Sequence, residues 1–254
     1  AYIISGEQKY VDFLNETVCD WIRENPCNQG YQWLCAQETS LRLINTLLTQ
    51  LLLGKRELSE GLINFVIQHC ERIYPTMHYA RAQQNNHATS EAAGLYLGGA
   101  FLLQSTELTS KQKKTARNWV EKGKKELERN VSALIMDDGS FSQYSVTYHR
   151  LVLDTLSFSV YIQRLFGFPD FSEKLVKKYE LAFQWLYALT DKLSYDAPNL
   201  GSNDGAMLFD ISLLPYRDFR PSLQFASGVL YGKCCFEADE SSNILKWLDL
   251  SVNE

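Results

Sequence analysis

Two amides and an imidazole, Asn85-Asn86-His87, stand where a polar stretch of the chain gives way to an apolar one. A side-chain amide can donate a hydrogen bond to a carboxylate without adding charge, and an imidazole can carry a proton near neutral pH. The start of a helix also favours anions. These residues therefore suggest chemistry on an acidic substrate, although a helix-capping amide and a structural histidine would give the same pattern.

The elements that must position these residues are helices, because apolar residues recur at helical spacing along nearly the whole chain. Small apolar helices such as 88–103 alternate with long charged ones such as 109–134, whose lysines and arginines we read as a solvated outer face. This alternation is typical of helical hairpins stacked into a ring. The sequence therefore predicts an all-α fold and one domain over residues 1–254. We expect helices over about 5–25, 34–53, 59–79, 88–103, 109–134, 147–166 and 170–193, with shorter ones after Ala206, Pro221 and Asp239.

Composition excludes several classes of function. The net charge of −5 provides no global basic field for nucleic acid. No apolar run reaches the length of about 18 residues that a membrane-spanning helix needs. The six cysteines form no C-x-x-C pair and no zinc-finger spacing with histidine, so we expect free thiols, no metal site and no cofactor. The chain opens at Ala1 without a visible signal segment, and we expect it to be a piece of a longer protein.

Several short motifs occur in one order along the chain. They are Asn25-Pro26 with Gly30-Tyr31-Gln32-Trp33 and Glu38 to Arg42, Asn85-Asn86-His87 with Glu91-Ala92-Ala93-Gly94, Asp138-Gly139-Ser140, Tyr148-His149-Arg150, and Leu200-Gly201-Ser202-Asn203-Asp204-Gly205.

In these motifs, over about residues 1–230, the chain resembles the heparinase II/III-like and alginate lyase-like polysaccharide lyases. The resemblance implies an incomplete (α/α) toroid followed by a β-sandwich that completes the active-site cleft. That second part is absent from this chain. The resemblance also favours a periplasmic or secreted location.

The reaction that this resemblance implies is β-elimination at a uronic acid within an acidic polysaccharide. Such a reaction needs a neutralised C6 carboxylate, a base for the C5 proton and an acid for the leaving O4. The resemblance gives carboxylate neutralisation to Asn86, and gives His87 either a share in that task or the role of base. It makes Tyr148 the proton-transfer residue. Tyr144 is a rival, because it lies four residues earlier and could share a helix face with Tyr148.

Further residues are candidates for substrate binding, each with a structural alternative. Trp33 could stack on a sugar ring, while Glu38 and Arg42 nearby fit a buried ion pair better than a binding site. Asp204 could contact sugar hydroxyls or cap the next helix. His149 and Arg150 could tune Tyr148 or form a structural pair. The full set is Asn85, Trp33, Tyr144, His149, Arg150 and Asp204.

Two other functions stay open at this stage. One is a non-catalytic toroid that binds acidic carbohydrate. The other is an (α/α) toroid glycoside hydrolase, which would need two carboxylates across a cleft, such as Asp138 and Asp204. The segment Phe141-Ser142-Gln143-Tyr144 lacks the acidic residue or histidine that often follows Asp-Gly-Ser in related proteins, so the substrate class is open.

Overall fold

The computed structural model describes residues 1–250, and helices make up its regular structure. Within that range the all-α prediction is confirmed, since the only β pairing is one isolated bridge between Ile135 and Phe141. None of the described helices is long and apolar enough to cross a membrane. The main helices are α2 (Lys9–Glu24), α3 (Ala36–Leu52), α4 (Glu60–Ile73), α5 (Met77–Ala82), α6 (Asn86–Leu102), α7 (Ser110–Leu134), α8 (Val146–Leu165), α9 (Glu173–Leu189) and α10 (Arg220–Tyr231), with α1 (Tyr2–Ser5) and α11 (Asn243–Trp247) at the two ends.

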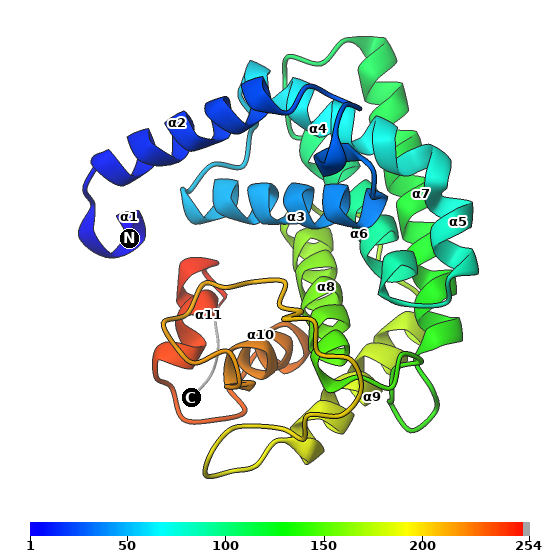
Figure 1. The fold of residues 1–254 in the computed structure, drawn as a ribbon, viewed down its shortest axis with the longest axis vertical. Helices are drawn as coiled ribbons and strands as arrows, with labels where there is room; N and C mark the ends of the chain where they lie inside the picture. Colours follow the sequence, from blue (N-terminus) through cyan, green and yellow to red (C-terminus); the bar gives the residue numbers. More distant parts are fainter. Residues whose placement is uncertain (251–254) are drawn as a thin grey trace.

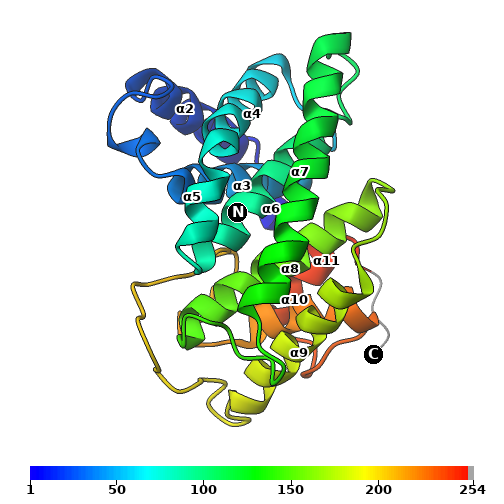
Figure 2. The ribbon, with the colours of Figure 1, turned by 90° about the vertical axis from the view of Figure 1, so that its right-hand side faces the viewer.

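The helices form two layers that follow an arc (Figure 1). Along the inside, α3 packs on α6, α6 on α8, and α8 on α10. On the outside, α4 covers α3 and α6, α7 covers α6, and α9 lies against α7, α8 and α10. Figure 2 shows the long α7 against the inner helices from the side. This alternation of inner and outer helices is the one expected from the sequence, while closure into a toroid stays a prediction.

Helix α6 lies at the centre of the two layers, and all of its residues except His87 are buried. Its glycines make this possible, because a side chain at either of two positions would meet a neighbouring helix. A Cβ built on Gly94 would lie 2.9 Å from the Cβ of Ser40 in α3, and one on Gly99 would lie 2.8 Å from the Ala116 carbonyl oxygen in α7. The expectation of a tightly buried inner helix is confirmed, and close packing offsets the low helix propensity of glycine.

Two helix predictions need correction. The helix expected over 59–79 is interrupted after Ile73, because Pro75 cannot continue the hydrogen-bond ladder; α5 then begins at Met77. No helix follows Ala206. The stretch from 190 to 219 runs as an irregular loop, and its carbonyl oxygens at Ala206 and Tyr216 accept hydrogen bonds from the Arg150 side chain. No disulfide joins any of the six cysteines, all of which lie within residues 1–250.

Candidate active site

The first turn of α6 holds the amides and the imidazole of the Asn85-Asn86-His87 motif. Asn85 is the N-cap residue, and its Oδ1 accepts a hydrogen bond of 3.0 Å from the backbone N–H of His87. The Asn86 residue is 5% exposed, and its side-chain amide makes no hydrogen bond to any other residue in the part of the chain that the structure describes. The amide atoms are not among the fully enclosed side-chain atoms that lack a partner, so the Asn86 amide reaches solvent and can bind a ligand.

Neighbouring segments hold the start of α6 in place. The backbone N–H of Asn86 donates to Oε1 of Gln143, just before α8, over 3.0 Å. The Asn130 amide of α7 donates to the Ala88 carbonyl over 2.7 Å, and Gln37 of α3 donates to the Ser90 hydroxyl over 3.3 Å. The first turn of α6 is therefore tied to the starts of both α3 and α8. Three inner helices direct their positive dipole ends toward one region, which favours an anion there.

His87 stands beside a buried carboxylate that sequence reasoning did not single out. The Nδ1 atom of His87 lies 3.5 Å from Oε1 of Glu91, one turn further along α6, and 3.4 Å from Nε2 of Gln83. Glu91 is 2% exposed, and its other oxygen has no hydrogen-bond partner among the described residues. The i, i+4 spacing between His87 and Glu91 is the sequence signal that could have found this pair.

Tyr148 lies in the first turn of α8, half-buried, and its hydroxyl donates a hydrogen bond of 2.9 Å to Oδ2 of Asp204. Burial, this hydrogen bond and the negative charge of Asp204 raise the pKa of Tyr148, and Tyr216 and Glu38 add to the effect. Tyr148 is therefore held in its protonated form at neutral pH. The expectation that His149 and Arg150 tune this hydroxyl is not met, because the groups that shift its pKa are Asp204, Tyr216 and Glu38.

The loop that carries Asp204 is fastened to the start of α8. The N–H of Val146 donates to the Leu200 carbonyl over 3.1 Å, and the Thr147 hydroxyl lies 3.2 Å from the Ser202 carbonyl. Gly201 adopts φ +71°, and a Cβ there would lie 2.8 Å from Cα of Ser145. Only glycine fits this close approach, which explains its place before Asp204.

Arg150 holds the other end of the same loop from inside the protein. Its side chain is fully buried, donates to the carbonyl oxygens of Tyr216 over 2.6 Å and Ala206 over 3.0 Å, and lies over the Tyr216 ring. The Tyr216 hydroxyl in turn donates to Oδ1 of Asn203 over 2.8 Å. In this structure Arg150 therefore orders the segment next to Asp204 and has no open face toward a substrate.

His149 also points inward. It is fully buried, its Nε2 lies 2.8 Å from the Ala182 carbonyl, and its ring stacks on Trp185 of α9 at 4.5 Å. Burial lowers its pKa to about 4, so the imidazole is neutral at physiological pH. The motif Tyr148-His149-Arg150 thus presents only its tyrosine to the outside. His149 and Arg150 do not form a pair with each other; each bonds backbone carbonyls.

Trp33 is 3% exposed and belongs to an aromatic cluster. Its ring lies 4.7 Å from His69, and Nε1 donates to the Asn25 carbonyl over 3.1 Å. Arg42 donates to His69 and the Gln32 carbonyl and stacks on Trp33, so the ion pair expected between Glu38 and Arg42 is absent from the described residues. Glu38 is exposed instead, and its charge reaches Tyr148.

Tyr144 is 77% exposed and precedes α8 in a left-handed conformation with φ +53°. The helix begins only at Val146, so the expectation that Tyr144 and Tyr148 share a helix face is wrong. Asp138 accepts two hydrogen bonds from Ser140, at 2.9 and 2.7 Å, within its own turn.

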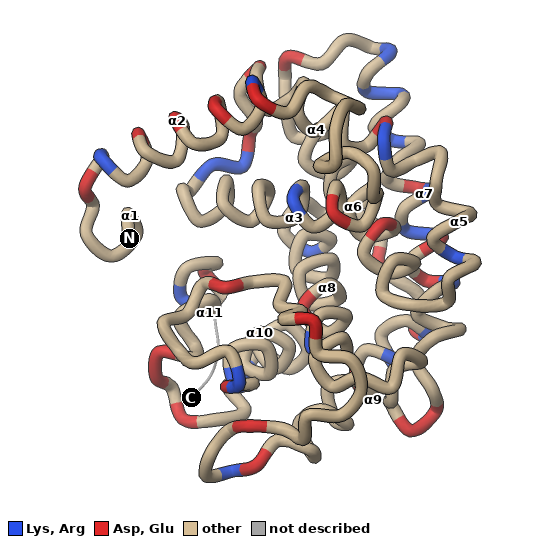
Figure 3. Tube along the Cα trace, viewed as in Figure 1, with Lys and Arg blue, Asp and Glu red and all other residues tan. Residues whose placement is uncertain are grey.

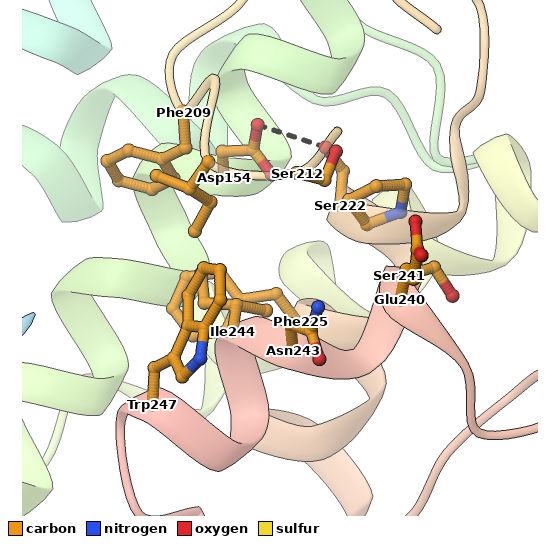
Figure 4. Close-up of a pocket in the computed structure, with 12 residues that line it drawn as sticks. Asp154, Phe209, Ser212, Ser222, Phe225, Glu240, Ser241, Asn243, Ile244 and Trp247 are labelled. Carbon is orange, nitrogen blue, oxygen red and sulfur yellow. Dashed lines mark hydrogen bonds between the residues drawn. The ribbon is translucent and has the colours of Figure 1, made fainter. Parts of the chain in front are cut away.

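A separate hollow between α8, α10 and α11 is lined by Asp154, Ser222, Phe209 and Trp247 (Figure 4). None of the predicted site residues lines it.

The structure therefore places Asn85, Asn86 and His87 together at the start of α6, and Tyr148 with Asp204 at the start of α8. The side chain of Gln143, just before α8, accepts a hydrogen bond from the Asn86 backbone. It separates Trp33, His149 and Arg150 from this open region. No group of three metal-ligating side chains occurs among residues 1–250.

Comparison with known proteins gave one match. A family model described as the heparinase II/III N-terminus matches residues 1–204, a span that ends on Asp204 and includes α6 and Tyr148. Neither the curated proteins nor the solved structures returned a match. Because the family model covers most of the chain, the chain belongs to the heparinase II/III N-terminal family.

Proposed function

We propose that this chain is the helical part of a polysaccharide lyase that cleaves a uronate-containing polysaccharide by β-elimination. Membership of the heparinase II/III N-terminal family relates it to polysaccharide lyases. The observation that carries the proposal is the unpaired Asn86 amide at the start of α6, which has a protonated tyrosine in the first turn of the next inner helix. The side chain of Gln143 accepts a hydrogen bond from the backbone N–H of Asn86, which ties the start of α6 to the segment before α8.

In the proposed reaction, the Asn86 amide donates a hydrogen bond to the C6 carboxylate. Negative charge that develops on that group as C5 loses its proton is stabilised by this donor and by the dipoles of the inner helices. His87 takes the C5 proton through Nε2, because its Nδ1 faces Glu91. A double bond forms between C4 and C5, and the C4–O4 bond breaks.

Tyr148 supplies the proton that the leaving O4 needs. A raised pKa suits this role, because a general acid must hold its proton until the bond to the leaving group breaks. Asp204 accepts the hydrogen bond from the Tyr148 hydroxyl and fixes its direction. Solvent then carries the proton from His87 back to Tyr148, so the enzyme returns to its starting state.

The test uses the full-length protein and the ultraviolet absorbance of the unsaturated uronate product. Asn86→Ala and Tyr148→Phe should each lower kcat by about 10²–10⁴-fold. Tyr144→Phe is the matched control, because this tyrosine is exposed and makes no side-chain contact with the site; its activity should equal that of the wild type. Full activity in both site variants would refute the assignment.

Two other outcomes would point to the alternatives. Binding of acidic oligosaccharides without any cleavage by the full-length protein would favour a non-catalytic toroid. Reducing ends that appear without ultraviolet absorbance would favour a glycoside hydrolase.

A further inference from the structure

Two adjacent cysteines, Cys234 and Cys235, follow the end of α10 at Gly232 and line one open groove. Both are partly exposed, and no disulfide joins them. The groove has a volume of about 380 Å³, which lies within the usual range for small-molecule sites. The other residues that line it are Phe183, Tyr187, Ser227, Tyr231 and Lys233. Two thiols in one groove can react in turn with the same molecule, so the pair is a candidate site for thiol chemistry.

The backbone on both sides of the pair is held to α10. The Oε1 atom of the fully buried Gln224 accepts hydrogen bonds from the N–H of Cys235 over 2.9 Å and from the N–H of Phe236 over 3.3 Å. The Cys235 thiol lies 3.5 Å from the same oxygen. On the other side, the Ser227 hydroxyl donates to the Lys233 carbonyl over 2.8 Å. The two cysteines are therefore fixed at the groove by contacts with one helix.

Two lysines bring positive charge to the groove. Lys233 lines it and is exposed, while Lys192, after α9, has its Nζ atom 3.3 Å from the ring centroid of Tyr187. The charge of Lys192 also reaches Cys235, where it acts against the rise in pKa that burial causes. An anionic group on a small molecule in this groove would therefore be attracted by both lysines.

The acidic residues close to these lysines already have partners. Acidic residues stand beside Lys192 on the turn after α9, as Figure 3 shows. Asp191 accepts hydrogen bonds of 2.7 and 2.8 Å from within this turn, and Asp196 pairs with Arg217 at 2.6 Å. Glu180, on α9, forms an ion pair with a lysine of its own helix at 3.6 Å. The groove thus favours a ligand that carries negative charge.

We propose that Cys234 and Cys235 form a reversible thiol–disulfide site for a small disulfide that carries carboxylates. The Cys234 sulfur, as a thiolate, attacks one sulfur of the ligand; the S–S bond of the ligand breaks, a mixed disulfide forms and one small thiol leaves. Cys235 then attacks the Cys234 sulfur, the second small thiol leaves, and a disulfide joins the two cysteines. Two protein thiols are oxidised, one small disulfide is reduced, and the two protons of the cysteines end on the released thiols. This inference does not depend on the lyase function proposed above.

Burial sets the order of the two attacks. It raises the pKa of Cys235 to about 12, so this thiol keeps its proton at neutral pH, and we assign the first attack to Cys234. The product is readily reversed, because neighbouring Cα atoms are about 3.8 Å apart whereas ordinary disulfides join Cα atoms about 4.4–6.8 Å apart. A strained disulfide is easily reduced, so the pair suits reversible modification better than a permanent cross-link.

The experiment treats the full-length protein, without denaturant, with dithiodipropionate or with the neutral hydroxyethyl disulfide of similar size, and maps the cysteines by mass spectrometry of peptides. We expect the wild type to acquire an internal disulfide between Cys234 and Cys235, which excess mercaptopropionate reverses. Cys235→Ser should stop at the mixed disulfide on Cys234, and Cys234→Ser should leave Cys235 unmodified. Cys19 is the internal control, because it is exposed on α2 with no cysteine next to it in the sequence, and it should retain the mixed disulfide.

The preference for negative charge is measured as the ratio of the rate constants for the anionic and the neutral disulfide. The ratio should be at least about threefold higher at Cys234 than at Cys19, which lies next to Asp20. Lys192→Gln should lower the ratio at Cys234, and Lys111→Gln on the outer helix α7 should leave it unchanged. A pair that stays unmodified while Cys19 reacts, or a mixed disulfide that persists on Cys234 in the wild type, would overturn the proposal. Equal ratios at the two cysteines would overturn the choice of an anionic ligand.

Discussion

Replacing Asp154 by asparagine should stabilise the protein at pH 8 and leave its stability nearly unchanged at pH 4. Asp154 lies on α8 at the hollow shown in Figure 4, is 2% exposed, and accepts a hydrogen bond of 3.0 Å from the Ser222 hydroxyl. Burial raises its pKa from 3.8 to about 7, although the hydrogen bond from Ser222 and the charge of Arg150 act in the opposite direction. The folded protein therefore holds a proton on this group that the unfolded chain releases.

The size of the effect follows from the difference between these two pKa values. A difference of about 3 units corresponds to about 4 kcal/mol, since each unit is worth about 1.36 kcal/mol. This contribution is fully present below about pH 4 and is lost progressively as the pH rises to about 7, because over that range the unfolded chain releases the proton while the buried group keeps it. Asparagine is neutral at every pH and can still accept from Ser222. The variant should thus gain up to about 4 kcal/mol over the wild type between pH 4 and pH 8.

Chemical denaturation at pH 4, 5.5, 7 and 8 measures this difference. The comparison between variant and wild type is essential, because buried histidines act in the opposite direction. His69 and His149 have pKa values lowered by burial to about 3 and about 4, so their contribution is present above pH 6.5 and is lost as the pH falls. That contribution is common to both proteins and cancels in the difference. A difference that does not change between pH 4 and pH 8 would refute the reasoning.

Three further predictions concern the site. Asp204→Asn removes the charge that helps to raise the pKa of Tyr148, so the alkaline limb of the kcat/KM profile should move to lower pH; an unmoved limb would exclude Tyr148 as the acid. Glu91→Gln keeps the shape but removes the carboxylate beside His87, and kcat should fall at least about tenfold with little change in KM, whereas Glu121→Gln on α7 should have no effect. Gly201→Ala should lower the free energy of unfolding by about 3 kcal/mol in thermal denaturation, because the new side chain meets both a φ of +71° and a close contact with Ser145. Gly205→Ala is the control, with φ +66° and open space around it, and should cost only about 1–2 kcal/mol. Equal losses in the two variants would show that the close approach of Gly201 to the start of α8 contributes nothing.

Periodicity in the sequence predicted the outer helices well, because an outer helix buries one stripe of its own side chains. Helix α6 is buried on nearly every side, and its run of small apolar residues predicted it instead. The capping box at Thr109 and Gln112 and the N-cap at Asn85 are local contacts, and both form as their spacing indicates. The predictions failed where distant segments decide the structure. The stretch after Ala206 has no helix, and the carbonyl oxygens of Ala206 and Tyr216 accept hydrogen bonds from the distant Arg150 side chain instead.

The same distinction applies to the site. The first turn of α6 could be read from adjacent residues, whereas the partner of Tyr148 lies 56 positions away in a loop. Gln143 gave no sequence signal, since nothing in its neighbourhood shows that its amide oxygen accepts from Asn86. Trp33 shows the opposite case. It belongs to one of the motifs and could have stacked on a sugar, but its ring is buried against His69.

Of the three residues in the motif Tyr148-His149-Arg150, only Tyr148 lies at the site, and Arg150 supports the site from inside the protein. Successive residues of an α-helix point about 100° apart, so three in a row cannot face the same opening. Tyr148 faces outward, His149 faces α9, and Arg150 faces the loop after Ala206. Arg150 holds Tyr216, Tyr216 bonds Asn203, and the next residue, Asp204, accepts from Tyr148. The buried arginine thereby contributes to the position of the carboxylate that orients the tyrosine, although it lies within the protein and the carboxylate is exposed.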